Sequence, residues 1–247
     1  MSERLDAWRS AADWRNGDCA AIDVLWCALR CSEEQLAAKH SLLTSHERAR
    51  AARFRRDADR AAYIIMRATL RERLAGWLGV TAMEVPLTEA AQGKPVLAMR
   101  EPRWEFNVSH SGEAGLIAFA WDRAVGVDVE AHRANFDSPE LGRSYFSSGE
   151  CAALDRAPAS ERLRWFFTLW TRKEAFLKAT GRGLSFPLDQ FSVTAPPDEP
   201  PRLIEIEGET DSERCWRLWN IDVGPGFSAT LAAAVSGDEV IAVRGWK

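Results

Sequence analysis

The run VGVDVE, residues 125–130, places two acids two positions apart in an apolar stretch. Successive side chains of a strand point to opposite faces, so Asp128 and Glu130 would share one face and the valines the other. A half-buried strand whose acids meet only water is the alternative for this run considered alone. The other charged residues of the chain must decide between a wet strand and a pair of carboxylates directed at a ligand.

Residues 170–178, WTRKEAFLK, supply a third acid and two ammonium groups. Glu174 and Lys178 are four positions apart, which stacks them on one helix face. On an isolated helix they would form a surface salt bridge worth about a few tenths of a kcal/mol. Combined with Asp128 and Glu130, however, Glu174 makes an all-oxygen set of the kind that suits Mg²⁺, together with waters and phosphate oxygens.

Several other groups could receive phosphates. SHSG, residues 109–112, offers hydroxyls, an imidazole and turn amides, and Lys173 and Lys178 add positive charge. Nine arginines against four acids between Glu47 and Arg73 form a basic region, for which a solvated helix face is the alternative. The residues themselves therefore indicate metal-assisted handling of a phosphorylated ligand.

Helices and strands in separate groups would position these residues. Apolar spacing and end signals predict four helical regions. The first begins at Ser32 and has about ten residues, and the second covers 47–79, with a break near Arg56–Asp59 and an end at Gly79. The third begins after Ser138, and the fourth covers 160–179. Strands are expected at 20–29, up to Val108, on both sides of Asp122–Arg123, and at 202–207, 215–223, 227–235 and 239–245, the last four as an antiparallel meander. SHSG would be a polar turn. Grouped rather than alternating strands predict an α+β fold.

The composition sets wider limits. The chain has 247 residues, of which 46% are hydrophobic and 28% charged, and this balance is that of an ordinary globular protein. A net charge of −4 gives no argument for nucleic-acid binding. No apolar run reaches membrane-spanning length and no signal peptide is evident, so we expect a cytoplasmic protein without a membrane partner. Five cysteines without a CxxC pair indicate reduced, mostly buried thiols.

Order and spacing make these motifs resemble the signature of 4′-phosphopantetheinyl transferases. GVDVE is followed 46 residues later, counted from Asp128 to Glu174, by WTRKEAFLK. This resembles the family pattern (I/V)-G-(I/V)-D, a gap of similar length, and (F/W)-(S/T/C)-x-K-E-(A/S)-x-x-K. GKP at 93–95, FNVSHSG at 106–112 and GRGLSFPLDQF at 181–191 stand in the order of the larger, Sfp-type members. The resemblance extends from about residue 20 to the C-terminus.

The resemblance implies a monomer of two similar α+β halves with the active site at their junction. It divides this chain into an N-terminal extension at 1–18, a first half at 19–122 and a second half at 123–247 that carries the metal site. The implied activity moves the 4′-phosphopantetheine group from coenzyme A to a serine of an apo acyl or peptidyl carrier protein and releases 3′,5′-adenosine diphosphate.

Carried over by motif, the catalytic residues would be Asp128, Glu174 and Lys178. Asp128, Glu130 and Glu174 would hold Mg²⁺, or alternatively Mn²⁺, on the pyrophosphate. Glu174 would also be the base for the incoming serine hydroxyl, and Lys178 would contact phosphate oxygens. A carboxyl with an ordinary pKa near 4 is a modest base, so positioning must supply much of the rate. Gly126 would let another backbone or the coenzyme approach closely.

The resemblance also implies contacts to coenzyme A. Gly93, Lys94 and Pro95 match the segment along the adenine, Ser109 the contact to the pyrophosphate, and His110 and Arg60 the contacts to the 3′-phosphate. Arg48, Arg50 and Arg53 stand where the family often has lysines, and the sequence leaves open which of them touches phosphate. We take Arg53 as the expected contact.

Two other classes of function compete with transfer. A noncatalytic module for coenzyme A or acyl-coenzyme A is disfavoured because all three acids and Lys178 are present. A magnesium phosphohydrolase would need a separate water-activating group, and the sequence offers none. Which carrier protein is served, whether of a fatty acid, polyketide, nonribosomal peptide or lysine pathway, is not readable from one sequence.

Overall fold

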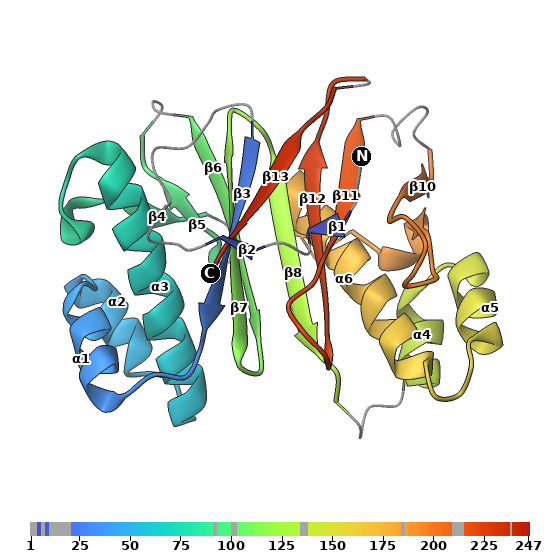
Figure 1. The fold of residues 1–247 in the computed structure, drawn as a ribbon, viewed down its shortest axis with the longest axis horizontal. Coiled ribbons are helices and arrows are strands. Elements are labelled where there is room, and N and C mark those ends of the chain that lie inside the picture. Colours follow the sequence, from blue (N-terminus) through green and yellow to red (C-terminus); the bar gives the residue numbers. More distant parts are fainter. Residues whose placement is uncertain are drawn as a thin grey trace.

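The computed structural model describes residues 4–5, 8–9, 21–90, 93–99, 103–133, 138–183, 186–208, 215–237 and 239–247. Figure 1 shows two β-sheets side by side, with α1–α3 covering the outer face of one and α4–α6 covering the outer face of the other. The mixture of grouped helices and strands confirms the predicted α+β class. None of the helices within the described ranges is both long and apolar enough to cross a membrane.

The first group of elements begins with a strand and continues through three helices, a short hairpin and two long strands. These are β3 (Ala21–Ala28), α1 (Glu33–Ser41), α2 (Ser45–Ala51), α3 (Asp57–Leu78), β4 (Leu87–Glu89), β5 (Pro95–Leu97), β6 (Trp104–Ser111) and β7 (Ala114–Trp121). Capping boxes begin α1 at Ser32 and α2 at Thr44. The predicted helix break is confirmed between α2 and α3, and α3 ends at Gly79 with a φ of 68°.

The second group runs through the same kinds of element. These are β8 (Val125–Ala131), α4 (Ser138–Tyr145), α5 (Ser148–Arg156), α6 (Arg162–Thr180), β9 (Phe191–Val193), β10 (Leu203–Ile206), β11 (Trp216–Ile221) and β12 (Phe227–Ala234). A capping box at Ser147 begins α5. Gly181, with a φ of 69°, ends α6. A last strand, β13 (Ala242–Trp246), follows β12.

Together with the short strands β1 (Arg4–Leu5) and β2 (Trp8–Arg9), these strands pair into two main sheets, with orders β2-β13-β3-β7-β6 and β1-β11-β12-β8. The predicted C-terminal strands exist, but the antiparallel meander is wrong because only β11 and β12 pair with each other in sequence. β13 instead runs parallel to β3 in the other sheet. Asp23 of β3 holds it there, accepting hydrogen bonds from Arg244 at 2.8 and 2.9 Å and from Trp246 at 2.8 Å. Such distant ion pairs have no signature in local sequence periodicity.

Two further short strands come from the predicted N-terminal extension. Within residues 1–18 the described positions are β1 (Arg4–Leu5), which pairs with β11, and β2 (Trp8–Arg9), which pairs with β13. The rest of the extension lies outside the described residues.

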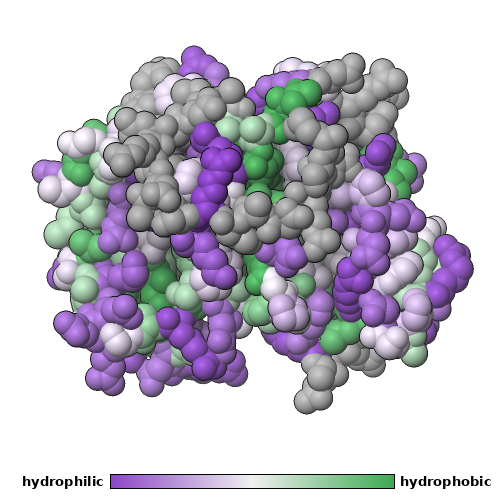
Figure 2. Space-filling model, in the orientation of Figure 1, coloured by the Kyte–Doolittle hydropathy of each residue, from purple (hydrophilic) through white to green (hydrophobic). Residues whose placement is uncertain are grey.

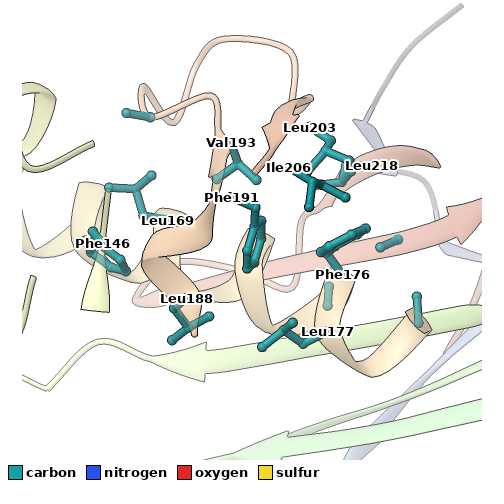
Figure 3. Close-up of a cluster of buried hydrophobic side chains, with 14 of the residues drawn as sticks. Phe146, Leu169, Phe176, Leu177, Leu188, Phe191, Val193, Leu203, Ile206 and Leu218 are labelled. Carbon is teal, nitrogen blue, oxygen red and sulfur yellow. The ribbon is translucent and has the colours of Figure 1, made fainter. Parts of the chain in front are cut away.

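Apolar cores hold the layers together, and three of them involve the main sheets and α6. Val125, Val127 and Val129 of β8 lie in the core between the two sheets, as the alternation predicts. A second core packs α3 on the sheet containing β3. The third surrounds α6, and Figure 3 shows Phe176 and Leu177 of that helix close to Phe191 and neighbouring aliphatic side chains. On the coloured part of the face in Figure 2, hydrophilic residues predominate along both helical flanks and hydrophobic ones form small separate patches.

Two local predictions need correction. Ser109, His110 and Ser111 belong to β6 rather than to a polar turn, because β6 pairs with β7 up to Ser111 and the chain reverses only at Gly112. The cysteines are not mostly buried: of the four that the structure describes, Cys31 and Cys215 are exposed and Cys27 is buried.

Candidate functional site

The two sheets meet where β6, the edge strand of one, lies beside β8, the edge strand of the other. Side-chain oxygens of β6 accept hydrogen bonds from the backbone amides of β8, so the amides of this edge are satisfied without a main-chain ladder. The bonds run from Val127 N to Asn107 Oδ1 at 3.0 Å, from Val129 N to Ser109 Oγ at 3.3 Å and from Ala131 N to Ser111 Oγ at 3.1 Å. The constant offset of 20 residues between partners shows that the strands run parallel. We call this contact the seam.

Helix α6 packs directly on β8 at Gly126. A Cβ placed on this glycine would lie 2.1 Å from the carbonyl oxygen of Ala175 and 2.4 Å from the amide nitrogen of Ala179. Only glycine allows so close an approach, and the group that approaches Gly126 is the backbone of α6. The close packing brings Glu174 and Lys178 beside Asp128.

Lys178 binds the first acid of the strand. Its Nζ lies 2.6 Å from Asp128 Oδ1, and it also donates to Ser109 Oγ at 3.0 Å and to the carbonyl oxygen of Val127 at 3.2 Å. Ser109 donates its own proton to the same Asp128 oxygen at 2.8 Å. The buried Asp128 carboxylate is therefore neutralised by an ammonium group in this structure.

The other two acids remain less well compensated. Burial, and then the neighbouring Asp128 charge, raise the pKa of Glu174 to about 7, although Lys178 opposes the shift. Burial likewise raises the pKa of Glu130, against a hydrogen bond of 2.7 Å that Ser111 donates to it. The mutual repulsion shows that all three carboxylates are close enough to interact, and it revises the expectation that Glu174 has an ordinary pKa.

The residues present suit a hard cation in their chemistry. Asp128 Oδ2 and Glu174 Oε1 are buried atoms without a hydrogen-bond partner, which is a costly state that a cation would relieve. The ligands are not preassembled: in the described ranges, no three His, Cys, Asp or Glu side chains converge as they would on one ion. The bond to Lys178 engages Asp128 Oδ1 and leaves Oδ2 without a partner.

A cavity of about 880 Å³ opens over these groups. It lies between the seam, helices α4 and α6, and the segment 186–189, and its aromatic wall includes Tyr145, Trp170 and Phe186. Tyr145 and Trp170 meet edge to face, with ring centroids 5.6 Å apart. Asp128, Glu130, Glu174, Lys178, Ser109 and His110 all line this cavity. These six predicted residues from three separate motif stretches are therefore brought together, whereas the other predicted residues lie elsewhere.

His110 lies at the edge of the cavity and is exposed. Partial removal from water and the Lys178 charge lower its pKa, while Asp59 at the start of α3 opposes them. The first turn of α3 therefore lies near His110. Arg60, in the same turn, is exposed and pairs with Asp57 at 2.7 Å. It does not line the cavity, and neither does the exposed Arg53.

The GKP segment is also separate from the acids. Lys94 and Pro95 line a second cavity, of about 540 Å³, near the beginning of β6 and β8. Gly93 faces the guanidinium of Arg50, whose nearest nitrogen would be 3.3 Å from an added Cβ, and Arg50 pairs with Glu89. Of the three upstream arginines, Arg50 is thus the one beside GKP.

Three basic residues considered as phosphate ligands are structural instead. Lys173 is fully buried and bonds Glu150 at 2.8 Å and the carbonyl oxygen of Leu188 at 2.8 Å. Arg67 and Arg71 of α3 are buried and share Glu47, at 3.6 and 2.7 Å. The predicted phosphate role for Lys173 is wrong, because apolar surroundings and a dedicated carboxylate leave it no access to a ligand.

Sequence reasoning missed Asn107 and Ser111, whose period-two spacing with Ser109 in FNVSHS was the available signal. It also missed the aromatic wall, for which no spacing signal exists because Tyr145, Trp170 and Phe186 come from three different segments.

Comparison with known proteins gives one consistent result. The family model described as the 4′-phosphopantetheinyl transferase superfamily matches residues 124–239, and the model described as 4′-phosphopantetheinyl transferase, N-terminal, matches residues 28–121. The 4′-phosphopantetheinyl transferase HetI of Nostoc sp. is 34% identical over 83% of each chain. A phosphopantetheinyl transferase of Thraustochytrium sp. is 30% identical over 73% of this chain and 67% of its own. The 4′-phosphopantetheinyl transferase Sfp of Bacillus subtilis is 28% identical over 82% of this chain and 87% of its own.

Proposed function

Because this chain belongs to the 4′-phosphopantetheinyl transferase family and is of the Sfp-like type, we propose that it transfers the phosphopantetheine group of coenzyme A to a serine hydroxyl of an apo acyl or peptidyl carrier protein, with release of 3′,5′-adenosine diphosphate. The observation that carries the proposal is the convergence of Asp128, Glu130, Glu174 and Lys178 on one cavity at the contact between the two sheets.

We place this site at the junction of two similar halves, residues 19–122 and 123–247, in a monomer. Strand order β3-β7-β6 in one sheet corresponds to β8-β12-β11 in the other, and each set follows the same succession of elements. β13 then completes the sheet of the first half. In this arrangement β6 and β8 contribute to the site from opposite halves.

Asp128, Glu130 and Glu174 would hold Mg²⁺, or Mn²⁺ in its place. The unpartnered buried oxygens of Asp128 and Glu174 support this assignment. When bound, the cation would supply charge neutralisation at the pyrophosphate. Asp128 would bind the cation through Oδ2, the oxygen that Lys178 does not use, and Lys178 would contact a phosphate oxygen. Its ammonium group could then offset charge that develops there in the transition state.

Glu174 is the proposed base for the carrier serine. Its pKa of about 7 belongs to the metal-free site; a bound cation would lower that pKa and keep the carboxylate ionised near neutral pH, so its position beside the serine hydroxyl would supply much of its effect. A carboxylate within hydrogen-bond reach of the serine hydroxyl would accept its proton as the oxygen attacks phosphorus.

The proposed contacts to the nucleotide are spread over three places: the main cavity, the first turn of α3 and the GKP segment. Ser109 and His110 line the main cavity and would contact the pyrophosphate and the 3′-phosphate. Arg60 is supported by the position of its helical turn near His110. Gly93, Lys94 and Pro95 would lie along the adenine, and Arg50 beside them is a better-placed candidate than Arg53.

The test is to incubate the full chain with coenzyme A, Mg²⁺ and a panel of apo carrier proteins and to weigh each carrier. A mass gain of one phosphopantetheine supports transfer. Intact coenzyme A with every carrier unmodified would favour a binding module, whereas cleavage of coenzyme A without carrier modification would favour a phosphohydrolase.

Replacing Glu174 by Gln tests the assignment of the base. Loss of a general base typically costs about 10²–10⁴-fold in rate. We expect turnover to fall by that amount while binding of coenzyme A, measured by calorimetry, survives. Near-normal turnover of Glu174→Gln would show that another group accepts the proton.

A further inference from the structure

Ser111 is a buried residue of β6 that none of the roles above uses. Its hydroxyl makes two bonds to β8. It accepts from the amide of Ala131 at 3.1 Å and donates to Glu130 Oε2 at 2.7 Å. A serine hydroxyl has one proton, which it donates here to the carboxylate, while its oxygen accepts the hydrogen bond of the amide.

The same two-bond unit occurs one step earlier along the seam. Ser109 accepts from the amide of Val129 at 3.3 Å and donates to Asp128 Oδ1 at 2.8 Å. Each serine thus joins one β8 amide to the acid that precedes it. Because the offset between partners is constant, the two serines hold the two acids of the strand in equivalent ways.

Asn107 shows what the seam does where no acid is present. It accepts from the amide of Val127 at 3.0 Å, but the residue before Val127 is Gly126. Asn107 therefore has the backbone contact of Ser111 without the contact to a carboxylate. Comparing Asn107 with Ser111 therefore separates two effects: the hydrogen bond that joins β6 to β8, and the hydrogen bond that orients an acid.

Glu130 needs such a restraint more than Asp128 does. Asp128 is held by Ser109 and Lys178 together. The Glu130 side chain is 22% exposed, and it forms an ion pair with Arg133, 3.6 Å away on a side chain that is 67% exposed. A pair with an exposed arginine at this distance restrains the carboxylate only weakly.

We propose that Ser111 is a positioning residue, which fixes the orientation from which Glu130 binds the divalent cation. The inference rests on the proposed function, since it concerns one of the proposed metal ligands. It adds that this orientation is supplied from β6, so that one half of the chain sets a ligand carried by the other. Groups that hold metal-binding carboxylates by hydrogen bonds typically contribute about 10–100-fold to affinity or activity.

The experiment measures Mn²⁺ binding to the full chain by the loss of the free-ion electron paramagnetic resonance signal. We expect Ser111→Ala to weaken Mn²⁺ binding by about tenfold, and Ser111→Thr, which keeps the hydroxyl, to bind nearly as the unmodified chain does. Asn107→Ala is the matched control. It should lower the melting temperature, because a buried amide loses its acceptor, and leave Mn²⁺ affinity unchanged.

A double-mutant cycle tests whether Ser111 acts through Glu130. In a Glu130→Gln background, Ser111→Ala should cause little additional loss of Mn²⁺ affinity, whereas independent effects would add. Unchanged affinity in Ser111→Ala, an equal loss in Asn107→Ala, or full additivity in the cycle overturns the inference.

The proposed function fails in a different way, which the same samples reveal. If Glu130→Gln weakens Mn²⁺ binding but Ser111→Ala does not, the positioning role falls and the metal site stands. If the unmodified chain binds no Mn²⁺, both the metal site and the role of Ser111 are overturned. If the chain binds Mn²⁺ but modifies no carrier of the panel, only the proposed transfer activity is contradicted. If Ser111→Ala also weakens that Mn²⁺ binding, the positioning role is supported.

Discussion

Lys173 and Lys178 lie five residues apart on α6, and each forms an ion pair with a buried carboxylate. Lys173 is fully buried, and Glu150 and two backbone carbonyls, those of Leu188 and Phe191, accept its hydrogen bonds. The Lys178 side chain is 28% exposed at a cavity, beside acids that retain unpartnered oxygens. Similar residue types thus form two different contacts. We call the fully bonded pair of Lys173 with Glu150 the closed pair, and the pair of Lys178 with Asp128, beside unpartnered acid oxygens, the open pair.

The difference follows from helix geometry and from what each face meets. Five residues of an α-helix correspond to about 140° of rotation, so the two side chains leave α6 in different directions. Lys173 meets α5 and the segment that leads into β9, whereas Lys178 meets β8 and the seam. A buried ion pair whose hydrogen bonds are complete favours a fixed structure, and an incompletely satisfied cluster favours ligand binding.

The largest effect should follow from breaking the closed pair. Replacing Lys173 by Met leaves the Glu150 carboxylate buried without its cation, which typically costs about 3–5 kcal/mol. For a chain of this size we expect the melting temperature to fall by on the order of 10 °C, measured by thermal unfolding. Added Mg²⁺ should not restore it, because this pair faces no cavity that holds the proposed metal ligands.

Lys39→Met is the matched control for that measurement. Lys39 pairs with Glu72 at 3.2 Å, but Glu72 is 46% exposed. An exposed pair contributes about 0–1 kcal/mol, so little change is expected. Equal losses in Lys39→Met and Lys173→Met would contradict the structural role of the buried pair.

Breaking the open pair should affect activity more than stability. Replacing Lys178 by Met removes a positive group from the proposed phosphate site, and losing one group of this kind costs about 10²–10³-fold in turnover. The metal-free variant should also be destabilised, because Asp128, Glu130 and Glu174 then repel one another without an ammonium group. Saturating Mg²⁺ should recover that stability but not the turnover. A variant that transfers phosphopantetheine at the normal rate would remove Lys178 from the mechanism.

The sequence was sufficient for features that depend on local periodicity or on short motifs. Alternation in VGVDVE predicted that the valines of β8 are buried, and the capping box at Ser32 and the glycine at position 79 predicted the start of α1 and the end of α3. It also identified the acids that share a cavity. Their grouping into one all-oxygen set came from the chemistry of the residues, and the family pattern added the role of each acid.

Contacts between distant segments could not be predicted in the same way. The partner of Lys173 comes from α5, and β13 crosses to the sheet of β3, where Asp23 holds it. These choices depend on tertiary packing, for which neither strand nor helix periodicity carries information. The raised pKa of Glu174 is another such consequence, since burial by several elements causes it.

The smallest effect expected is a pH-dependent change in stability at the open cluster. The pKa of Glu174 is raised to about 7 in the folded, metal-free chain, above its ordinary value near 4.5. The folded state therefore binds this proton more tightly than the unfolded state does. The resulting stabilisation is fully present below about pH 4.5 and is lost as the pH rises through about 7.

Glu174→Gln cannot ionise, so its stability should not fall as the pH rises through about 7. In the presence of a chelator, the variant should melt higher than the unmodified chain at pH 8, by about 2–4 °C if the gain is about 1 kcal/mol, and the difference should shrink at pH 5. Glu84→Gln is a control of opposite sign, because hydrogen bonds from Thr81 lower the pKa of Glu84 and favour its charged form. That variant should gain nothing at pH 8. If Glu174→Gln were less stable than the unmodified chain at pH 8, the Glu174 carboxylate would be a satisfied charge, and the contrast between the closed pair and the open pair on α6 would fail.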